Sequence, residues 1–310
     1  RECAHPYWSG RGTESLGVCA KEQQPSGLGA TSALGDVRRA AKAIKSGLCE
    51  TAMILGVDAP STQWRAYYGS YRNEFWDPVG VQGPPGAFGL LMNRYEHQYG
   101  IDYRGLGALA VAQRNGAIKN PNAYEKLRHK ITVDDYINSR QVSSPLRLLD
   151  SVMWADGGNG LVMMKTSRAK KLGLTNRIYP ISYAEISNFD CANQTPDMTA
   201  TGHSVVGPKV LRDAKLKAKD VDMFHPYDDF LFAVMLKTEQ CGFAKKGQGS
   251  QFLRDTDLGP KGELPLNTGG GQISCGQPGL AGGGINLVEA VRQLMGEGKG
   301  RQVPNARNAM

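Results

Sequence analysis

The chain has 310 residues, 40% apolar and 21% charged, a composition typical of a soluble globular protein with room for two domains of ordinary size or one large one. Its net charge of +8 comes from Lys and Arg interleaved with Asp and Glu, without the basic and aromatic block that nucleic-acid binding requires, so we expect no nucleic-acid partner. No apolar run approaches the roughly 18 residues of a membrane-spanning helix, which predicts no membrane span.

The first regular elements predicted along the chain are a helix and a buried strand. Residues 31–47 carry apolar side chains such as Val37 and Ile44 on one face and basic ones on the other, the pattern of an amphipathic helix that ends at Gly47. The apolar run at 50–58 is typical of a buried strand. A helix followed by such a strand is half of an α/β unit.

A long insertion is expected after this strand, at about 59–150. Its first part, 60–76, is rich in Trp and Tyr and serves either as a lid over a substrate or as ordinary packing at an interface. The run GPPGAFG at 83–89 predicts a loop, with a helix directly after it and another at 104–121. A Pro-broken loop and a buried strand within 131–166 are predicted to follow.

The remaining residues read as a second α/β half, 177–310, after a first half at 1–176 whose start we expect to be incomplete. A strand is predicted at 177–186, and a helix leading into a strand at 207–224. The sequence HPYDDF then stands at that strand's carboxyl end, where open α/β sheets bind ligands. The helix predicted after 282 buries Ile285, Val288, Val291 and Leu294.

A glycine-rich loop at 267–284 leads into this last helix. Glycines let backbone amides approach a ligand closely, and a helix N-terminus adds partial positive charge. This combination favours a site for an oxyanion or a bound anion, over tight strand–helix packing as the alternative. The candidate residues for this site are Asn267, Gly270, Gly271, Cys275 and Gly276. Cys275 is interpreted either as a small core residue or as a thiol that transfers a proton.

The six cysteines are widely spaced, and no pair has the C-x-x-C spacing of a zinc ribbon. We therefore expect reduced thiols in a cytoplasmic protein, with neither a metal nor a cofactor bound by this chain.

Several of these segments resemble the thiolase superfamily, in the branch of sterol-carrier-protein-type thiolases and lipid-transfer-protein-like steroid side-chain aldolases. HPYDDF resembles the H-D-C-F block of that branch, and NTGGGQISCGQPGLAGGG resembles its N-x-x-GG-x-x-x-x-G-H-P block. The resemblance implies an α/β thiolase fold, with two related halves in αβαβα layers and a loop domain inserted in the first. By comparison, the family's first β-α region and its last strand pair are missing.

The departures from the thiolase pattern bear directly on the reaction. The nucleophile position falls on Ala30, which cannot form an acyl-enzyme, and the histidine of G-H-P falls on Gln277. Tyr227 stands in place of the H-D-C-F histidine, as in the steroid side-chain aldolases, although those also have a tyrosine at the Gln277 position. Cys19 remains an alternative nucleophile if the alignment at Ala30 is wrong.

A retro-aldol cleavage fits these substitutions, because it needs a base, an oxyanion site and an acid but no covalent intermediate. Tyr227 is the expected acid or base, although its reference pKa is about 10. Asp228 either orients Tyr227 or caps the following helix, and His225 either relays a proton or is satisfied by backbone groups. Gln277 is expected to hold a carbonyl or a water through its amide.

We therefore expect an acyl-CoA lyase that cleaves a bulky β-hydroxyacyl-CoA. The alternatives are a thiolase or acyltransferase with an unrecognised cysteine, and a non-catalytic subunit that binds acyl-CoA. The resemblance further implies a homodimeric core and a small partner subunit with an oligonucleotide-binding-type fold and a zinc ribbon, so that any zinc would belong to the partner.

Overall fold

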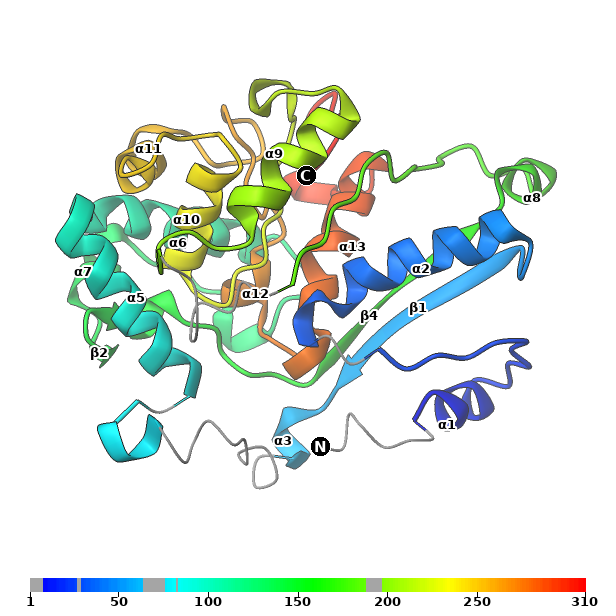
Figure 1. Cartoon of the computed structure of the whole chain (residues 1–310), viewed down its shortest axis with the longest axis horizontal. Coiled ribbons are helices and arrows are strands. Elements are labelled where there is room, and N and C mark those ends of the chain that lie inside the picture. Colours follow the sequence, from blue (N-terminus) through cyan, green and yellow to red (C-terminus); the bar gives the residue numbers. More distant parts are fainter. Residues whose placement is uncertain (1–7, 27–28, 64–75, 82, 188–196) are drawn as a thin grey trace. The chain divides into compact units, whose positions relative to one another are not determined.

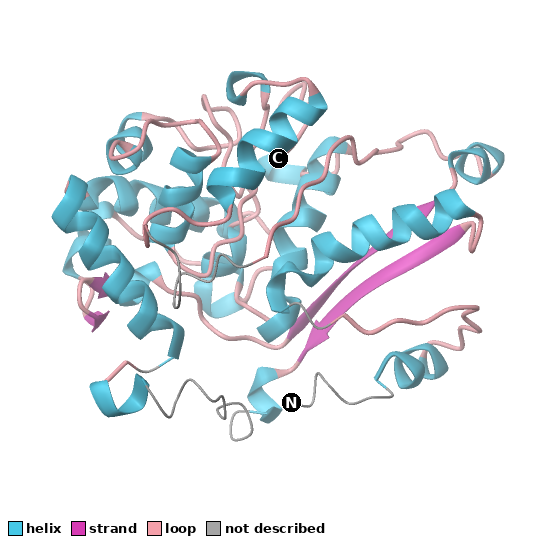
Figure 2. Cartoon of the chain, in the orientation of Figure 1, coloured by secondary structure: helices cyan, strands magenta, loops and turns pink. Residues whose placement is uncertain are grey.

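The computed structural model describes residues 8–26, 29–63, 76–81, 83–187 and 197–310 (Figure 1). The chain forms two compact units: the first comprises Arg1–Tyr68, Trp154–Arg177 and Gln277–Val288, and the second comprises Gly69–Met153, Ile178–Gly276 and Glu289–Met310. Each unit takes segments from both of the expected halves, 1–176 and 177–310, so those halves stay a prediction. Helices predominate over strands in the part of the chain that is described (Figure 2).

The first unit is built on an antiparallel pair of strands, β1 and β4, with helix α2 packed against them (Figure 1). The strands pair without interruption from Thr51 opposite Met164 to Asp58 opposite Gly157. The elements of this unit are α1 (Trp8–Ser15), η2 (Gly29–Thr31), α2 (Ser32–Ser46), β1 (Thr51–Asp58), α3 (Pro60–Gln63), β4 (Gly157–Met164), α8 (Thr166–Lys171), η7 (Gly279–Gly282) and the start of α13 (Gly283–Leu294).

The first predicted helix and strand are confirmed, but the strand is not buried on both faces. Gly47 ends α2 in the left-handed conformation, with φ of 81° and its N–H donated to the carbonyls of Ala43 and Ile44. Along β1, Leu55 is 51% exposed and Val57 is 59% exposed. Successive side chains of a strand point to opposite faces, and α2 covers only one face of this pair.

The second unit is mainly helical, and α6 lies at its centre, in contact with α7, α10, α11 and α12. Its elements are η3 (Asp77–Val79), α5 (Gly83–Tyr99), α6 (Tyr103–Ile118), η4 (Glu125–Leu127), α7 (Val133–Asn138), β2 (Gln141–Ser143), β3 (Leu146–Arg147), η5 (Leu148–Asp150), α9 (His203–Ala214), η6 (Ala218–Asp220), α10 (Leu231–Gln240), α11 (Gly249–Asp255), α12 (Gly271–Cys275), the end of α13 and η8 (Lys299–Arg301). The hydrophobic core joins α5, α6 and α10, and every residue from Leu231 to Glu239 is buried.

Three predictions about this unit need correction. The expected loop at 83–89 is the beginning of α5, because prolines are well tolerated in the first turn of a helix. The strand expected at 177–186 is irregular, and the described residues offer it no neighbouring strand. The strand expected before residue 225 is reduced to one parallel bridge between Phe224 and Leu266. Most of the aromatic stretch 60–76 lies outside the described residues.

The buried face of α13 is more polar than expected. Ile285, Val288, Val291 and Leu294 are only partly buried, whereas Glu289 is 5% exposed and Gln293 is 1% exposed. Glu289 forms an ion pair with Arg301 at 2.7 Å and accepts a hydrogen bond from Thr268 Oγ1 at 3.1 Å. A buried carboxylate is tolerated there because it is paired and hydrogen-bonded.

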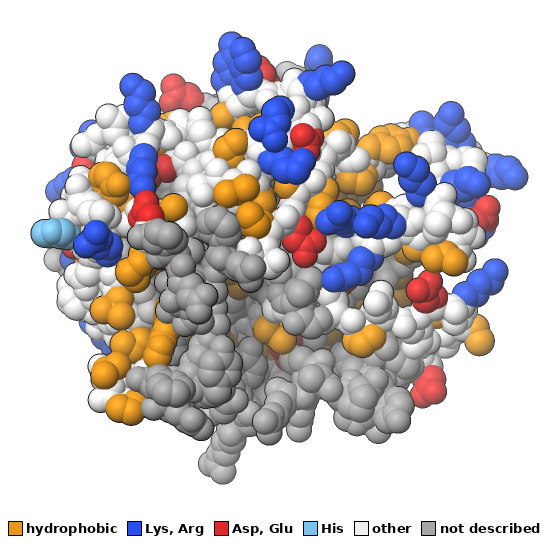
Figure 3. Space-filling view, in the orientation of Figure 1, with side chains coloured by type: hydrophobic (Ala, Val, Ile, Leu, Met, Phe, Trp, Pro, Cys, Tyr) orange, Lys and Arg blue, Asp and Glu red, His pale blue; other side chains and the backbone are white. Residues whose placement is uncertain are grey.

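Lys and Arg side chains are spread over the described part of the face drawn in Figure 3, with Asp and Glu among them. No helix among the described residues is long and apolar enough to cross a membrane.

Candidate functional site

Asp228 lies at the buried centre of the candidate site in the second unit. Its Oδ2 accepts hydrogen bonds from Gln113 Nε2 at 2.8 Å and Ile273 N at 3.3 Å. Its Oδ1 accepts one from Gln272 N at 3.0 Å. Both amides belong to the first turn of α12, where the helix leaves N–H groups without partners. Asp228 therefore caps a helix as the sequence allowed, but the helix is α12 rather than α10.

The closeness of Asp228 to α12 depends on glycine. Gly271 has φ of +59°, and a Cβ there would lie 2.0 Å from Asp228 Oδ2. Gly270 has φ of +108°, and its Cβ would lie 2.7 Å from the Cβ of Ala117 on α6. Any other residue type would meet both the strain of the left-handed region and a collision. These two glycines allow the loop to close onto α6 and the carboxylate.

The amides of this loop are largely used within the protein. Gly270 N donates to Asn267 O at 2.8 Å, and Gly276 N donates to Gln272 O at 3.0 Å. The side chain of Asn267 is buried, and its Nδ2 donates to Pro226 O at 3.1 Å. These bonds support a loop-building role for Gly270, Gly276 and Asn267, and an oxyanion role for them stays a prediction.

Tyr227 is half-buried and is accompanied by a buried lysine from α10. Lys237 Nζ donates a hydrogen bond to the carbonyl oxygen of Tyr227 and lies 5.4 Å from the centroid of its ring. Burial lowers the pKa of Lys237, and the carboxylates of Asp229 and Asp228 oppose that change. Burial raises the pKa of Asp229, and Lys237 opposes it. The candidate acid or base therefore lies beside the amino group of a buried lysine.

His225 is also enclosed, but its ring is not held by backbone groups. Its two ring nitrogens are buried without a hydrogen-bond partner among the described residues, and its backbone N–H donates to Met310 O at 2.7 Å. Burial lowers the pKa of His225 to about 4, so the imidazole is neutral near pH 7. The proton relay proposed for His225 stays a prediction.

The two cysteines considered from the sequence differ in environment. Cys275 Sγ donates to Gly269 O at 2.9 Å, and burial raises the pKa of its thiol to about 12. A protonated, buried thiol supports the core interpretation of Cys275. Cys19 is a free, exposed thiol in the first unit.

Gln277 and Ala30 belong to the first unit and are described there. Gln277 is 8% exposed, forms a parallel bridge with Trp154 and accepts a hydrogen bond from Ala155 N at 3.1 Å through its carbonyl oxygen. Ala30 lies in the short helix η2, directly before α2. The pairing of Gln277 with Tyr227, a residue of the second unit, stays a prediction.

Two residues of the site were missed in the sequence. Lys237 had a local signal, since it is a charged residue that follows six apolar ones in the helix after HPYDDF. Gln113 had none, because it lies 115 residues before the carboxylate that it binds.

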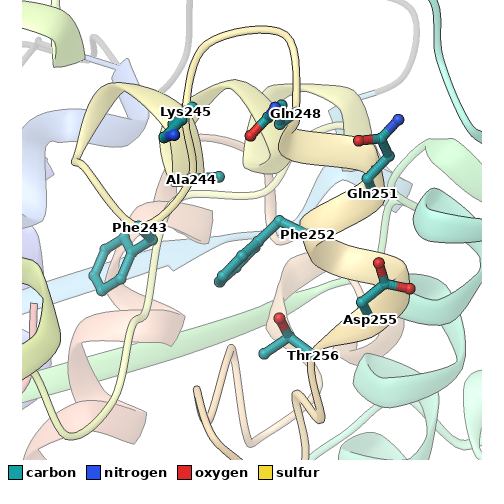
Figure 4. Close-up of a pocket in the computed structure, with 8 residues that line it drawn as sticks. All are labelled: Phe243, Ala244, Lys245, Gln248, Gln251, Phe252, Asp255 and Thr256. Atoms are coloured by element: carbon teal, nitrogen blue, oxygen red, sulfur yellow. The ribbon is translucent and has the colours of Figure 1, made fainter.

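A pocket of about 390 Å³ opens along α11 in the second unit. Figure 4 shows Phe243 and Phe252 there, together with Lys245, Gln248 and Gln251. None of the predicted site residues lines this pocket. Among the described residues, no group of three or more His, Cys, Asp or Glu is placed to hold a metal ion.

The family described as "Thiolase C-terminal domain-like" matches residues 184–310. The chain is 32% identical to the 17-hydroxy-3-oxo-4-pregnene-20-carboxyl-CoA lyase of Mycobacterium tuberculosis, over 72% of this chain and 58% of that protein. It is 30% identical to the steroid side-chain-cleaving aldolase of Thermomonospora curvata, over 87% of this chain and 72% of that protein. The match thus spans somewhat over half of the first relative and nearly three quarters of the second.

Two solved structures also superpose on this chain. The structure of an "Ltp2-ChsH2(DUF35) aldolase" superposes with a TM-score of 0.75 at 28% identity, over 91% of this chain and 73% of that chain. A monomeric SCP2-thiolase-like protein from Mycobacterium smegmatis, at 22% identity, has a TM-score of 0.67 over 87% of this chain and 56% of that chain, which shows the fold alone. The expected α/β thiolase fold is confirmed by these neighbours. The chain belongs to the thiolase superfamily, with a steroid side-chain-cleaving aldolase and sterol carrier protein 2 among its relatives.

Proposed function

We propose that this chain is the thiolase-like subunit of an acyl-CoA lyase, which cleaves a bulky β-hydroxyacyl-CoA by a retro-aldol reaction. The observation that carries the proposal is the contact of Tyr227, from the HPYDDF block that resembles the H-D-C-F block of the family, with the amino group of the buried Lys237. Two relatives support it, since they are named a CoA-ester lyase and a side-chain-cleaving aldolase.

In this reaction Tyr227, as phenolate, accepts the proton of the substrate's β-hydroxyl group. The oxygen lone pair forms the new carbonyl group, and the bond between the α and β carbons breaks. Its electron pair becomes the thioester enolate, and the Tyr227 phenol gives its proton to the α carbon, which regenerates the phenolate. No acyl-enzyme forms, which agrees with alanine at position 30. Gln277 is proposed to hold a substrate carbonyl through its amide.

The proposed assembly is a homodimeric thiolase core with a small second subunit. The structural neighbour is named as an aldolase of two components, Ltp2 and ChsH2(DUF35), which supports a partner for this chain as well. We propose that the partner has an oligonucleotide-binding-type fold with a zinc ribbon, that this chain has no cofactor of its own, and that the enzyme is cytoplasmic.

The test is turnover by the full-length protein with its partner subunit. A β-hydroxyacyl-CoA and a β-ketoacyl-CoA are supplied, each with and without free CoA. We expect cleavage of the hydroxy substrate without CoA, and a loss of at least about 100-fold in kcat for Tyr227→Phe, the usual contribution of an acid or base. Tyr99→Phe is the matched control, because Tyr99 is an exposed tyrosine that also lies near a lysine, Lys246, at 5.5 Å.

Two results would contradict the proposal. Cleavage of the keto substrate that requires free CoA would identify a thiolase, the activity named in relatives such as the acetyl-CoA acetyltransferase of Methanothermobacter thermautotrophicus. Binding of acyl-CoA without turnover of either substrate would identify a non-catalytic subunit.

A further inference from the structure

Lys237 is unusual because its charged side chain lies inside the core of the second unit. The residue is 8% exposed, and its neighbours along α10 from Leu231 to Glu239 are all buried. A lysine is almost never buried unless its charge has a partner. We therefore expect polar or charged groups around the ammonium group of Lys237.

The groups around the ammonium come from several segments. Its Nζ donates to the carbonyl oxygen of Tyr227 and lies over the Tyr227 ring at 5.4 Å from the centroid. The titratable groups that interact with it electrostatically are Asp228, Asp229, Cys241 and His203. No carboxylate of the described residues lies within 4.0 Å of Nζ.

The nearby acidic groups do not neutralise Lys237 by direct pairing. The Asp228 carboxylate is occupied by Gln113 and the amides of α12. The Asp229 carboxylate accepts a hydrogen bond from Phe230 N at 3.1 Å. These negative charges favour the protonated form of Lys237, and its direct contacts are with the carbonyl oxygen and the ring of Tyr227. The ammonium group of Lys237 therefore has Tyr227 as its direct neighbour.

We propose that Lys237 is a positioning residue that holds Tyr227 through its carbonyl oxygen and stabilises the Tyr227 phenolate, so that this phenol serves as the base of the cleavage. The inference rests on the proposed function, and it explains how a tyrosine takes a proton near neutral pH. Lys237 Nζ lies 5.4 Å from the centroid of the ring, and an opposite charge near an ionising group shifts its pKa by roughly 1–3 units. Lys237 is buried and Tyr227 is half-buried, so water screens this attraction less than it does on the surface, and the attraction has to outweigh the desolvation that disfavours both charged forms.

Three substitutions separate the charge from the hydrogen bond. Lys237→Met keeps the length of the side chain but removes both, Lys237→Gln keeps a donor without the charge, and Lys237→Arg keeps the charge. The matched control is Lys246→Met, because Lys246 lies over the exposed ring of Tyr99 at a similar 5.5 Å. Each variant is made in the full chain with its partner subunit.

The first readout is the ionisation of Tyr227 itself, followed by NMR in protein with ¹³Cζ-labelled tyrosine and assigned with Tyr227→Phe. We expect the unsubstituted protein to titrate Tyr227 below pH 10, the ordinary value. Lys237→Met and Lys237→Gln should raise the midpoint by about 1–2 pH units, and Lys246→Met should leave it in place. A Tyr227 that titrates at or above pH 10 in the unsubstituted protein overturns the inference, even if no Lys237 variant folds.

The second readout is the pH profile of kcat/KM for the β-hydroxyacyl-CoA. The ascending limb of the profile, which reports the ionisation of the base, should move to higher pH in Lys237→Met and Lys237→Gln. At pH 7, kcat/KM should fall by about 10- to 100-fold in both variants. Lys237→Arg should restore part of that loss. If Lys237→Gln is as active as the unsubstituted enzyme, the hydrogen bond rather than the charge is what matters, and the inference is wrong. Failure of the proposed function looks different, because then the unsubstituted protein shows no turnover at any pH.

Discussion

The binding of Asp228 to α12 makes a quantitative prediction about stability. Asp228→Asn keeps the size of the side chain but removes the charge and replaces one acceptor oxygen by a donor. The carboxylate accepts from Gln113, Gln272 and Ile273 at 2.8, 3.0 and 3.3 Å. Hydrogen bonds to charged groups contribute about 1.5–3 kcal/mol each, against about 1 kcal/mol for neutral ones.

The size of the effect follows from which bonds survive. The new amide can keep the bond from Gln272 through its oxygen. Its nitrogen can donate to Oε1 of Gln113, which has no partner among the described residues, once that amide turns over. The bond from Ile273 is then lost, at about 2 kcal/mol, and the other two weaken by about 0.5–1 kcal/mol each. The free energy of unfolding should therefore fall by about 3–4 kcal/mol.

Urea unfolding at pH 7 measures this change, and hydrogen exchange at the amide of Ile273 locates it. Asp222→Asn is the matched control, because the Asp222 carboxylate also accepts two backbone amides, from Arg307 at 2.8 Å and Asn308 at 3.0 Å, but near the surface. That control should cost at most about 1 kcal/mol. If Asp228→Asn costs less than about 1 kcal/mol, or leaves exchange at Ile273 unchanged, Asp228 does not hold α12 as described.

Three further predictions concern other buried groups. Gly271→Ala should destabilise the fold by at least about 2 kcal/mol in urea unfolding, because φ of +59° and a 2.0 Å approach leave no room for a Cβ, whereas Gly300→Ala, with nothing within 4 Å, should be nearly neutral. Burial raises the pKa of Asp150 from 3.8 to about 6, so its contribution to stability is full below about pH 4 and is lost as the pH rises through 6. Asp150→Asn should therefore remove this fall in the free energy of unfolding between pH 4 and 6. An unchanged dependence on pH would contradict the prediction. A maleimide at pH 7.5 should label Cys19 and leave Cys275 unmodified in peptide mapping, and rapid labelling of Cys275 would contradict its burial.

The sequence predicted the elements whose signals are local. The apolar period of 32–46 and the αL glycine that follows it identify α2, and the apolar run at 51–58 identifies β1. Local signals gave a wrong prediction where a strand depends on a neighbouring strand. Residues 177–186 are apolar and aromatic, but they have no strand to pair with among the described residues. Local signals also gave a wrong prediction at α13, because the polar residues on its buried face are satisfied by Arg301 and Thr268 from other segments.

The same distinction applies to the candidate site. The HPYDDF block and the glycine-rich loop are visible as motifs, so Tyr227, Asp228 and Gly271 could be named in advance. The role of Asp228 could not, because it depends on Gln113 and on amides 44 and 45 residues further along the chain. Lys237 could have been noticed as a charge in an apolar helix, but only the fold places it on the Tyr227 ring.

The buried contacts around Asp228 also have a consequence for synthesis on the ribosome. The carboxylate needs Gln113 and the start of α12, and Thr268 in the adjoining loop is tied to Glu289, which in turn needs Arg301. These partners span nearly 190 residues of sequence. Segments far apart in the chain must therefore come together, at a cost in entropy, before these stabilising contacts can form. The centre of the second unit can therefore be completed only after residue 301 has left the exit tunnel. Until then its apolar helices are incompletely packed, and their exposed apolar surface is prone to aggregation.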